Sequence, residues 1–155
     1  MRLTEILQPA CIKVPLTATV KQGAIFELID LLAACHKLVS PEQLKEAVWS
    51  RELTRTTGIG HGIAIPHGKS AGCAQLSMAI GLTSHPLEFG AIDGRPVQII
   101  ILLASPPDQT GPHIQALARI SRLLTDDRIR TAMKTASSSD AIYKLIADHE
   151  IQDNV

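Results

Sequence analysis

Residues 58–69 read GIGHGIAIPHGK and are the stretch where we expect the chemistry of the protein to occur. Its glycines remove side-chain bulk and free the backbone to adopt positive φ angles, which is typical of a loop. Within it, residues 63–65 are short, apolar and partly β-branched and predict a buried strand. Pro66 is expected to end regular strand pairing and to leave His67 at a strand end. These residues alone leave two interpretations open: a site where His67 meets a bulky anion, or a glycine-rich turn that contains a histidine.

The same twelve residues closely resemble the phosphorylation-site motif of the IIA proteins of the bacterial phosphoenolpyruvate-dependent phosphotransferase system, in the fructose/mannitol/nitrogen-regulatory class. The resemblance extends roughly from Leu3 to Ala147. It implies that His67 accepts a phosphoryl group from the small histidine carrier HPr or its nitrogen-branch counterpart. We expect backbone amides of the glycine loop to hold the phosphoryl oxygens, the candidate glycines being Gly58, Gly60, Gly62 and Gly68.

Two helices are predicted before this stretch. Thr19 with Gln22 three residues later forms a capping-box pattern, and apolar residues then recur at helical spacing. Ser40, with Pro41 at the first helical position and Gln43 three residues after the serine, predicts a second helix start. The apolar stripe of the first helix consists of Ile25, Leu28, Ile29 and Leu32.

The sequence after the stretch predicts a central strand and further helices. Residues 97–104 are apolar almost throughout, as expected of a strand covered on both faces, so helices must lie on both sides of its sheet. Pro112 can open the next helix, and the polar tail from Glu150 to Val155 is expected to fray. We therefore predict a single α/β domain over residues 1–155. The resemblance adds a mixed, mostly five-stranded sheet with a core at about residues 3–147.

Two further residues are candidates for the site. His113 follows Gly111-Pro112, and a helix starting there would place it where unpaired N–H groups favour anions. The resemblance implies that His113 lies beside His67 and bonds the phosphoryl oxygens. Arg51 stands sixteen residues before His67, where mannitol-type relatives place an active-site arginine. Its guanidinium suits phosphate, although a solvated charge at a helix end is an equally ordinary role.

One position departs from the mannitol-type pattern. Those relatives often carry a glutamate where this chain has His61, which favours a phosphate neighbour and weakens an assignment to mannitol. This departure from the mannitol-type pattern favours the nitrogen-regulatory subclass. Arg55 is close enough in sequence to be confused with Arg51, and Lys69 could add positive potential.

Composition excludes several other classes. Fifteen Lys and Arg residues balance fifteen Asp and Glu residues, so no net field attracts nucleic acid or anionic membrane. The cysteines at positions 11, 35 and 73 form no C-x-x-C pair and are expected to be reduced packing thiols. No signal peptide or membrane-length apolar run is visible, so we expect a soluble, cytoplasmic protein without membrane insertion. The six histidines show no metal-binding spacing, and the predicted chemistry needs no metal or other cofactor.

The predicted function is that of a phosphocarrier, a phosphotransferase component that receives its group from an HPr-type protein. Two branches stay open. The chain could pass the group to a sugar-permease IIB component, as fructose-type IIA proteins do, or act as a nitrogen-branch regulatory IIA whose phosphorylation state controls other proteins. The end of the chain at residue 155, without an attached IIB or membrane domain, favours the regulatory branch. A third interpretation is a regulatory module that binds other proteins without being phosphorylated.

Overall fold

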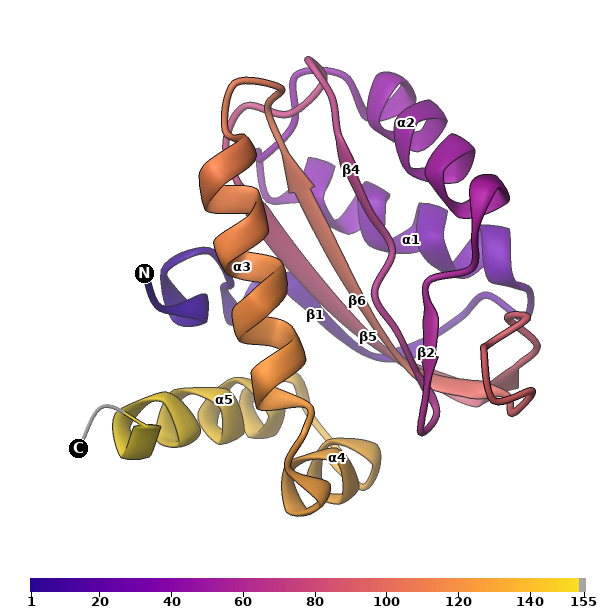
Figure 1. Ribbon diagram of the computed structural model, residues 1–155, viewed down its shortest axis with the longest axis vertical. Helices are drawn as coiled ribbons and strands as arrows, with labels where there is room; N and C mark the ends of the chain where they lie inside the picture. Colours follow the sequence, from indigo (N-terminus) through magenta and orange to yellow (C-terminus); the bar gives the residue numbers. More distant parts are fainter. Residues whose placement is uncertain (154–155) are drawn as a thin grey trace.

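A mixed sheet runs through the middle of the protein in the computed structural model, which describes residues 1–153 (Figure 1). Its strands follow the order β1-β5-β6-β3-β2, and β4 also pairs with β6. β5 and β6 are antiparallel, β1 is parallel to β5, and β3 and β4 are parallel to β6. The strands are β1 (Ile12–Leu16), β2 (Gly58–Gly60), β3 (Ile63–Ala64), β4 (His67–Lys69), β5 (Ser77–Leu87) and β6 (Val97–Ser105). The predicted mixed, mostly five-stranded sheet is confirmed, with β4 as a short sixth strand.

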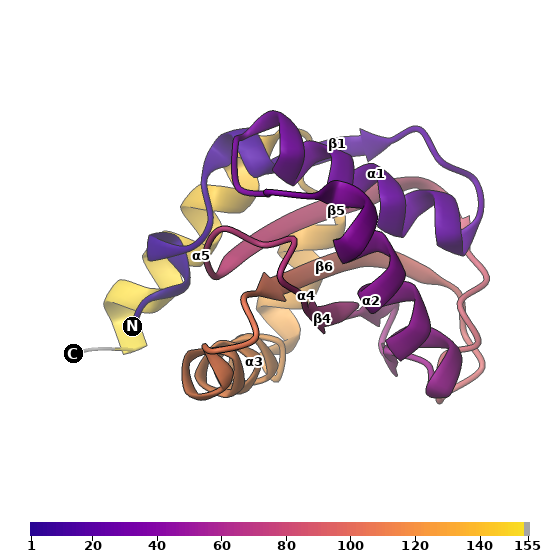
Figure 2. The same cartoon turned by 90° about the horizontal axis from the view of Figure 1, so that it is seen from above.

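Helices cover both faces of this sheet (Figure 2). α1 and α2 lie on one side, whereas α3, α4 and α5 lie on the other. The bounds are α1 (Lys21–Ala34), α2 (Pro41–Thr54), α3 (Thr110–Leu123), α4 (Asp127–Lys134) and α5 (Ser139–Asp153), with short 3-10 turns η1 (Leu3–Glu5) and η2 (Pro9–Cys11) at the N-terminus. In the described part of the chain, none of these helices combines the length and apolar character needed to cross a membrane.

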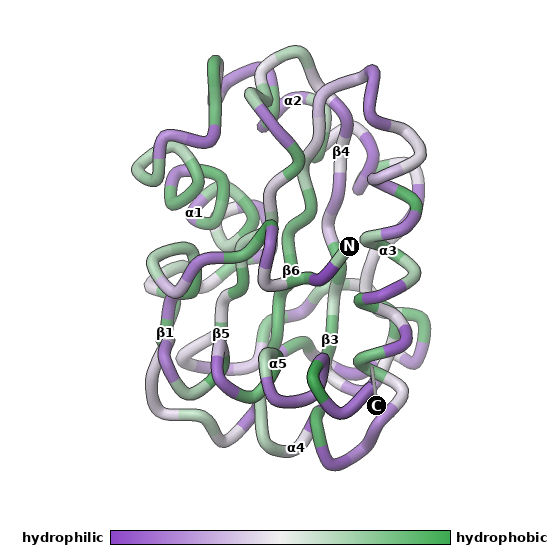
Figure 3. Tube along the Cα trace, turned by 90° about the vertical axis from the view of Figure 1, so that its left-hand side faces the viewer, coloured by the Kyte–Doolittle hydropathy of each residue, from purple (hydrophilic) through white to green (hydrophobic). Residues whose placement is uncertain are grey.

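β6 is the centre of the core, as predicted from its apolar run. All of its residues are buried except Gln98, and the apolar residues of β5 are buried beside it. The hydrophobic colouring of β6 in Figure 3 shows how apolar this strand is. A strand with both faces buried must be apolar on both faces, and this explains the continuous rather than alternating pattern. The end of β6 at Ser105 leads directly toward α3, so the strand and the helix start share one corner of the molecule.

The two predicted helix starts before the glycine-rich stretch have different outcomes. α2 begins as expected, because the Ser40 hydroxyl accepts a hydrogen bond from the backbone N–H of Gln43 at 3.3 Å. The predicted Thr19 cap is wrong: α1 begins at Lys21, its N-cap is Val20, and no side chain caps it. The carboxylate of Glu27 instead accepts the backbone N–H groups of residues 17 and 18, which fixes the approach to the helix from within it. The apolar stripe of α1 is fully buried as predicted.

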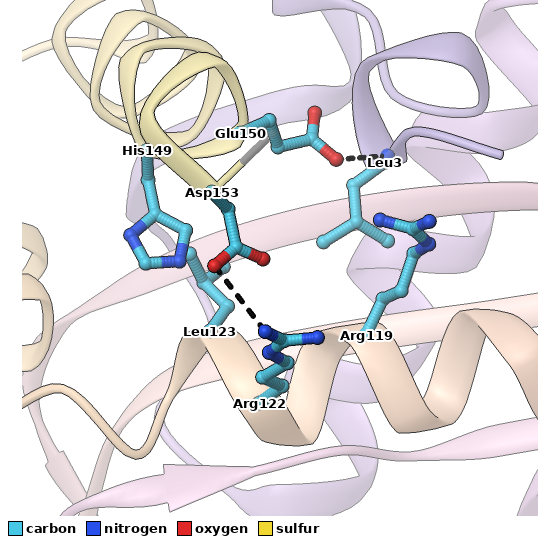
Figure 4. A pocket seen from close by; sticks show the side chains of 7 residues that line it. All are labelled: Leu3, Arg119, Arg122, Leu123, His149, Glu150 and Asp153. Atoms are coloured by element: carbon cyan, nitrogen blue, oxygen red, sulfur yellow. Dashed lines mark hydrogen bonds and ion pairs between the residues drawn. The ribbon is translucent and has the colours of Figure 1, made fainter. Parts of the chain in front are cut away.

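The prediction of a frayed tail from Glu150 is wrong for residues 150–153, while 154–155 lie outside the described residues. α5 continues to Asp153, and the Glu150 side chain is buried against the N-terminus (Figure 4). Its carboxylate accepts hydrogen bonds from the backbone N–H groups of Leu3 and Thr4 and from the Thr4 hydroxyl. Glu150 therefore provides a partner for the Leu3 N–H, which would otherwise be buried without one.

The three cysteines are free thiols, as expected. Burial, together with the neighbouring Cys35 thiol, raises the pKa of Cys11 to about 12, and burial raises the pKa of Cys73 to about 11. Thiols with such pKa values are protonated at neutral pH and are poor nucleophiles. They contribute to packing.

Candidate functional site

His67 is held in one orientation by the backbone just before it. It opens β4, opposite Leu103 of β6, and its ring Nδ1 lies 2.8 Å from the carbonyl oxygen of Ile65. A carbonyl can only accept, so Nδ1 carries the hydrogen in the neutral ring and Nε2 keeps a free lone pair. The expectation that Pro66 ends strand pairing is wrong: its carbonyl accepts the Leu103 N–H at 3.0 Å, and pairing resumes at His67.

His113 lies beside His67, as the resemblance implied. The two ring centroids are 5.8 Å apart and the ring planes are inclined at 58°. α3 begins at Thr110 rather than at Pro112, which still leaves His113 in the first turn of the helix. His113 is 4% exposed, and its Nδ1 lies 2.7 Å from the hydroxyl of Ser105.

Ser105 and the carbonyl of Ile65 are site groups that sequence reasoning missed. Each sets the hydrogen bonding of one histidine ring. Neither belongs to a polar motif: Ser105 merely ends an apolar strand, and a backbone carbonyl leaves no trace in side-chain identity. Only the pairing of β4 with β6, which brings His67 near the end of β6, could have pointed to Ser105.

The surroundings of both histidines lower the pKa of the ring and so favour its neutral form. Burial lowers the pKa of His67, and the positive charge of Arg51 lowers it further, against the opposing effect of the Ile65 carbonyl. Burial lowers the pKa of His113 to about 4, with smaller contributions from His67 and Lys69. A neutral imidazole with a free nitrogen is a nucleophile, whereas a protonated one is not.

Arg51 shares a surface hollow of about 370 Å³ with both histidines. It lies in the last turn of α2, where its Nη1 donates to the carbonyl of Arg55 at 2.9 Å. Gly68 and Lys69 also line this hollow. The structure therefore brings together His67, His113 and Arg51, and places Lys69 beside them.

A second hollow of about 310 Å³ adjoins the first, sharing the side chains of Arg51, His67 and Leu117. Gly58 lines this second hollow, as do the apolar side chains of Ile59 and Ile92, which are 40% and 68% exposed.

Gly60 and Gly62 are not part of the site, and the expectation that their amides hold the phosphoryl group is wrong. They form the tip of the β2–β3 hairpin, with φ angles of +100° and +79° that L side chains rarely adopt. Ile63 pairs with Ile99 whereas His67 pairs with Leu103, so the tip lies about 13 Å or more from His67 along β6. Gly60 and Gly62 therefore allow the tight turn of the hairpin and lie too far from His67 to bind a phosphoryl group on it.

His61 also lies at this tip and is not a neighbour of His67. Its φ is +58°, and its backbone N–H donates to the carboxylate of Asp93 at 3.1 Å. It lines a separate hollow together with Arg95, Arg130 and Lys134. The expectation that His61 supports a phosphoryl group on His67 is therefore wrong.

Among residues 1–153, no three side chains of His, Cys, Asp or Glu come close enough to one another to hold a metal ion. The groups that meet at the site are the imidazoles of His67 and His113, the guanidinium of Arg51, the ammonium group of Lys69 and the surrounding backbone.

A family model described as "Phosphoenolpyruvate-dependent sugar phosphotransferase system, EIIA 2" matches residues 5–149. The chain belongs to this family. It is 34% identical over 153 residues to the nitrogen regulatory protein of Escherichia coli (strain K12), covering 97% of this chain and 92% of that protein. It is also 34% identical over 150 residues to the fructose-specific EIIABC component of Bacillus subtilis (strain 168). That match covers 97% of this chain and 24% of the relative, so the chain spans about a quarter of the larger protein.

Solved structures show the same fold. The nitrogen regulatory protein IIA-Ntr from Neisseria meningitidis superposes with a TM-score of 0.80 at 30% identity, over 92% of this chain and 97% of that one. A complex of enzyme IIAMTL and phosphorylated enzyme IIBMTL from Escherichia coli matches with a TM-score of 0.78 at 21% identity, over 92% and 99% of the two chains. The single α/β domain is thus the architecture of IIA proteins of both nitrogen-regulatory and mannitol type.

Proposed function

We propose that this family member is a phosphocarrier that accepts a phosphoryl group on Nε2 of His67 from an HPr-type protein. The observation that carries the proposal is the 2.8 Å contact between Nδ1 of His67 and the Ile65 carbonyl. This contact leaves the lone pair of Nε2 free, on a neutral ring, in a hollow shared with Arg51 and His113.

The transfer is a displacement at phosphorus. The lone pair of Nε2 forms a new P–N bond while the P–N bond to the donor's histidine breaks, and its electron pair returns to the donor nitrogen. Nδ1 of His67 keeps its hydrogen. The Ile65 carbonyl that accepts this hydrogen stabilises the positive charge that the ring gains as the bond forms.

The neighbouring groups stabilise the phosphoryl oxygens. Arg51 offers a fork of N–H donors that retains its charge at any physiological pH. If the Ser105 hydroxyl donates to Nδ1 of His113, the imidazole carries its hydrogen on Nε2 and can donate it to a phosphoryl oxygen. Catalysis then rests on positioning and electrostatics rather than on proton transfer.

Exposed apolar side chains support a docking surface for the donor. Ile59 and Ile92 line the hollow beside His67, while Leu53 and Ile114 are 70% and 60% exposed on α2 and α3, within two residues of Arg51 and His113. A small apolar rim around a charged centre suits a transient protein partner. A IIB component is a second partner of the same kind, as in the enzyme IIAMTL complex.

The test is intact-mass analysis after incubation with phosphoenolpyruvate, enzyme I and either HPr or its nitrogen-branch counterpart. We expect one acid-labile phosphoryl group on the wild type, none on His67→Ala, and slower acquisition on His113→Ala. The absence of any mass gain on the wild type with both carriers would favour the unphosphorylated binding module instead.

We further propose that the chain belongs to the nitrogen-regulatory branch and acts in the cytoplasm. The 34% identity over 92% of the Escherichia coli nitrogen regulatory protein, and the 30% identity to Neisseria IIA-Ntr, support this branch. A fructose-type IIA that serves a IIB permease component is the alternative, supported by the equal identity to the Bacillus protein. Faster phosphorylation by the nitrogen-branch carrier than by HPr would support the regulatory branch, and the reverse order would support the sugar branch.

A further inference from the structure

Glu52 is a buried carboxylate that the reaction described above does not use. Glu52 is 3% exposed and lies near the end of α2, directly after Arg51. One carboxylate oxygen accepts the backbone N–H of Thr57 at 2.7 Å, and the other accepts the Thr57 hydroxyl. The ammonium group of Lys21, on α1, lies 3.0 Å from the carboxylate and compensates its charge.

The contacts of Thr57 continue to the ring of His67. The Thr57 carbonyl accepts the backbone N–H of Ile65 at 3.0 Å, and the Ile65 carbonyl is the acceptor for Nδ1 of His67. A chain of hydrogen bonds therefore connects Glu52 to His67 through Thr57 and Ile65. The first two links join residues that are five and eight positions apart in sequence, and the last joins the ring of His67 to the backbone two residues before it.

We propose that Glu52 is a positioning residue for His67, fixing the tautomer and orientation of the imidazole through Thr57 and Ile65. The effect on the tautomer stands independently of the activity, whereas the effect on phosphoryl transfer rests on the function proposed above. If the Ile65 carbonyl is displaced, it no longer accepts the hydrogen of Nδ1, and the two neutral tautomers become closer in energy. The ring is then also less well oriented for attack through Nε2.

The same carboxylate is also connected to the segment that carries Ile92, a residue lining the hollow of about 310 Å³ beside His67. Lys21, which pairs with Glu52, donates to the Phe89 carbonyl at 3.0 Å and lies 4.6 Å from the centroid of the Phe89 ring. The backbone after Phe89 returns to the site, where the N–H of Ile92 donates to the Gly58 carbonyl at 3.0 Å. A change at Glu52 is thus expected to disturb the histidine and the adjoining apolar wall together.

Glu52 could instead act on His67 only through its charge. Glu52→Gln separates the two effects, because its amide oxygen can accept the Thr57 N–H and its amide nitrogen can donate to the Thr57 hydroxyl. Glu52→Ala removes both the charge and the hydrogen bonds. A positioning role predicts that Gln preserves the tautomer and Ala does not, whereas a purely electrostatic role predicts that both variants behave alike.

Glu150 provides the matched control. It is also a buried carboxylate, 6% exposed, that accepts backbone N–H groups, yet its partners are Leu3 and Thr4 rather than anything near His67. Glu150→Ala should lower stability in the same way as Glu52→Ala. It should leave the His67 ring unchanged.

The experiment measures the ring ¹⁵N chemical shifts of His67 at neutral pH by NMR, and the phosphorylation rate by the carrier, in the full chain. For Glu52→Ala we expect the shifts of Nδ1 and Nε2 to move toward a mixture of tautomers and the rate to fall about 10- to 100-fold. Glu52→Gln should keep wild-type shifts and a rate within about threefold of wild type, and Glu150→Ala should match the wild type in both.

A folded Glu52→Ala variant with wild-type shifts and rate would overturn the proposal, as would equal changes in Glu150→Ala. If Glu52→Ala does not fold, Thr57→Val carries the test, because it removes one of the two hydrogen bonds to Glu52 and leaves the backbone one. A partial change of the His67 shifts is then expected, and unchanged shifts would overturn the proposal. If the wild type is not phosphorylated at all, the proposed function fails while the shifts still decide the role of Glu52.

Discussion

At His67, one backbone carbonyl decides which ring nitrogen carries the hydrogen, and burial keeps the ring neutral. At His113, the partner of Nδ1 is the Ser105 hydroxyl, and because a hydroxyl can donate or accept, its orientation decides which tautomer the ring adopts. The two imidazoles thus differ through their hydrogen-bond partners: His67 has a free lone pair for attack, and His113 can donate from Nε2 to the arriving group when the Ser105 hydroxyl donates to its Nδ1.

Ser105→Ala tests the role assigned to His113. The substitution removes the partner of His113 Nδ1 at a fully buried position, so the tautomer that donates from Nε2 loses its support. We expect phosphorylation to slow about tenfold, the cost of roughly one hydrogen bond in the transition state. The rate is measured by intact mass against time. In His113→Ala the same serine substitution should have no further effect, and an additive loss would contradict the assignment.

The acid sensitivity of the fold follows from the lowered pKa of His113. Its pKa is about 4 in the folded state, against about 6.5 for an exposed histidine, so the unfolded chain binds the proton first. The contribution of this residue to stability is therefore complete above pH 6.5 and is lost as the pH falls toward 4, by on the order of 3 kcal/mol.

Urea unfolding at pH 7, 6 and 5 measures this loss. His113→Gln, which cannot titrate, should lose less stability than the wild type across this range, whatever its stability at pH 7. Parallel losses in the two proteins would show that His113 is not the titrating group.

At the scale of the elements, the site depends on the close approach of β4 to α2. A Cβ atom at Gly68 would lie 2.9 Å from Cγ2 and 3.3 Å from the backbone nitrogen of Val48. Because backbone atoms are among these neighbours, α2 itself would have to move, and α2 carries Arg51. Gly68 therefore acts through close packing of the site, not by a positive φ.

Gly68→Ala is accordingly expected to destabilise the fold by about 1–3 kcal/mol and to slow phosphorylation. Gly111→Ala is the matched control, since a Cβ there meets nothing within 4 Å and the position lies in the first turn of α3. Chemical denaturation and the phosphorylation rate are measured on both. Equal behaviour of the two variants would contradict the packing role of Gly68.

Sequence patterns predicted the elements better than their connections. The continuous apolar run of β6 and the stripe of α1 follow from burial alone, and both were confirmed. The Thr19 cap failed because a residue inside the helix, Glu27, binds the preceding backbone instead. Such long-range acceptors compete with local capping patterns, and their partners are not visible in sequence.

The candidate site divides in the same way. The glycine-rich stretch indicated His67 as the central candidate, but it also led to the prediction that four glycines belong to one phosphate-binding loop. Pairing with β6 separates Gly68, at the site, from Gly60 and Gly62, at the far end of the hairpin. The distance between them is a property of the sheet register, which a local motif does not contain.

At the scale of the whole molecule, the two ends of the chain are joined through Glu150. Its carboxylate accepts two backbone N–H groups from η1, and α5 packs against the same turn (Figure 4). A C-terminal helix thereby closes the N-terminal turn onto the domain, on the face of the sheet opposite α1 and α2 (Figure 2).

Glu150→Ala should lower the free energy of unfolding by about 2–3 kcal/mol, because the buried N–H of Leu3 and the partly buried N–H of Thr4 lose a charged acceptor. Thermal and urea denaturation measure the change. The phosphorylation rate should stay at the wild-type value, since no partner of Glu150 lies near His67. A slowed reaction would show that the two ends of the molecule are coupled.

The most direct test of the central claim is to locate the phosphoryl group on the ring. NMR of the ¹⁵N-histidine-labelled phosphoprotein reports which nitrogen of which histidine is bonded to phosphorus. The account predicts phosphorus on Nε2 of His67, with Nδ1 still carrying the hydrogen that the Ile65 carbonyl accepts. Phosphorus on Nδ1 of His67, or on any other histidine, would contradict it.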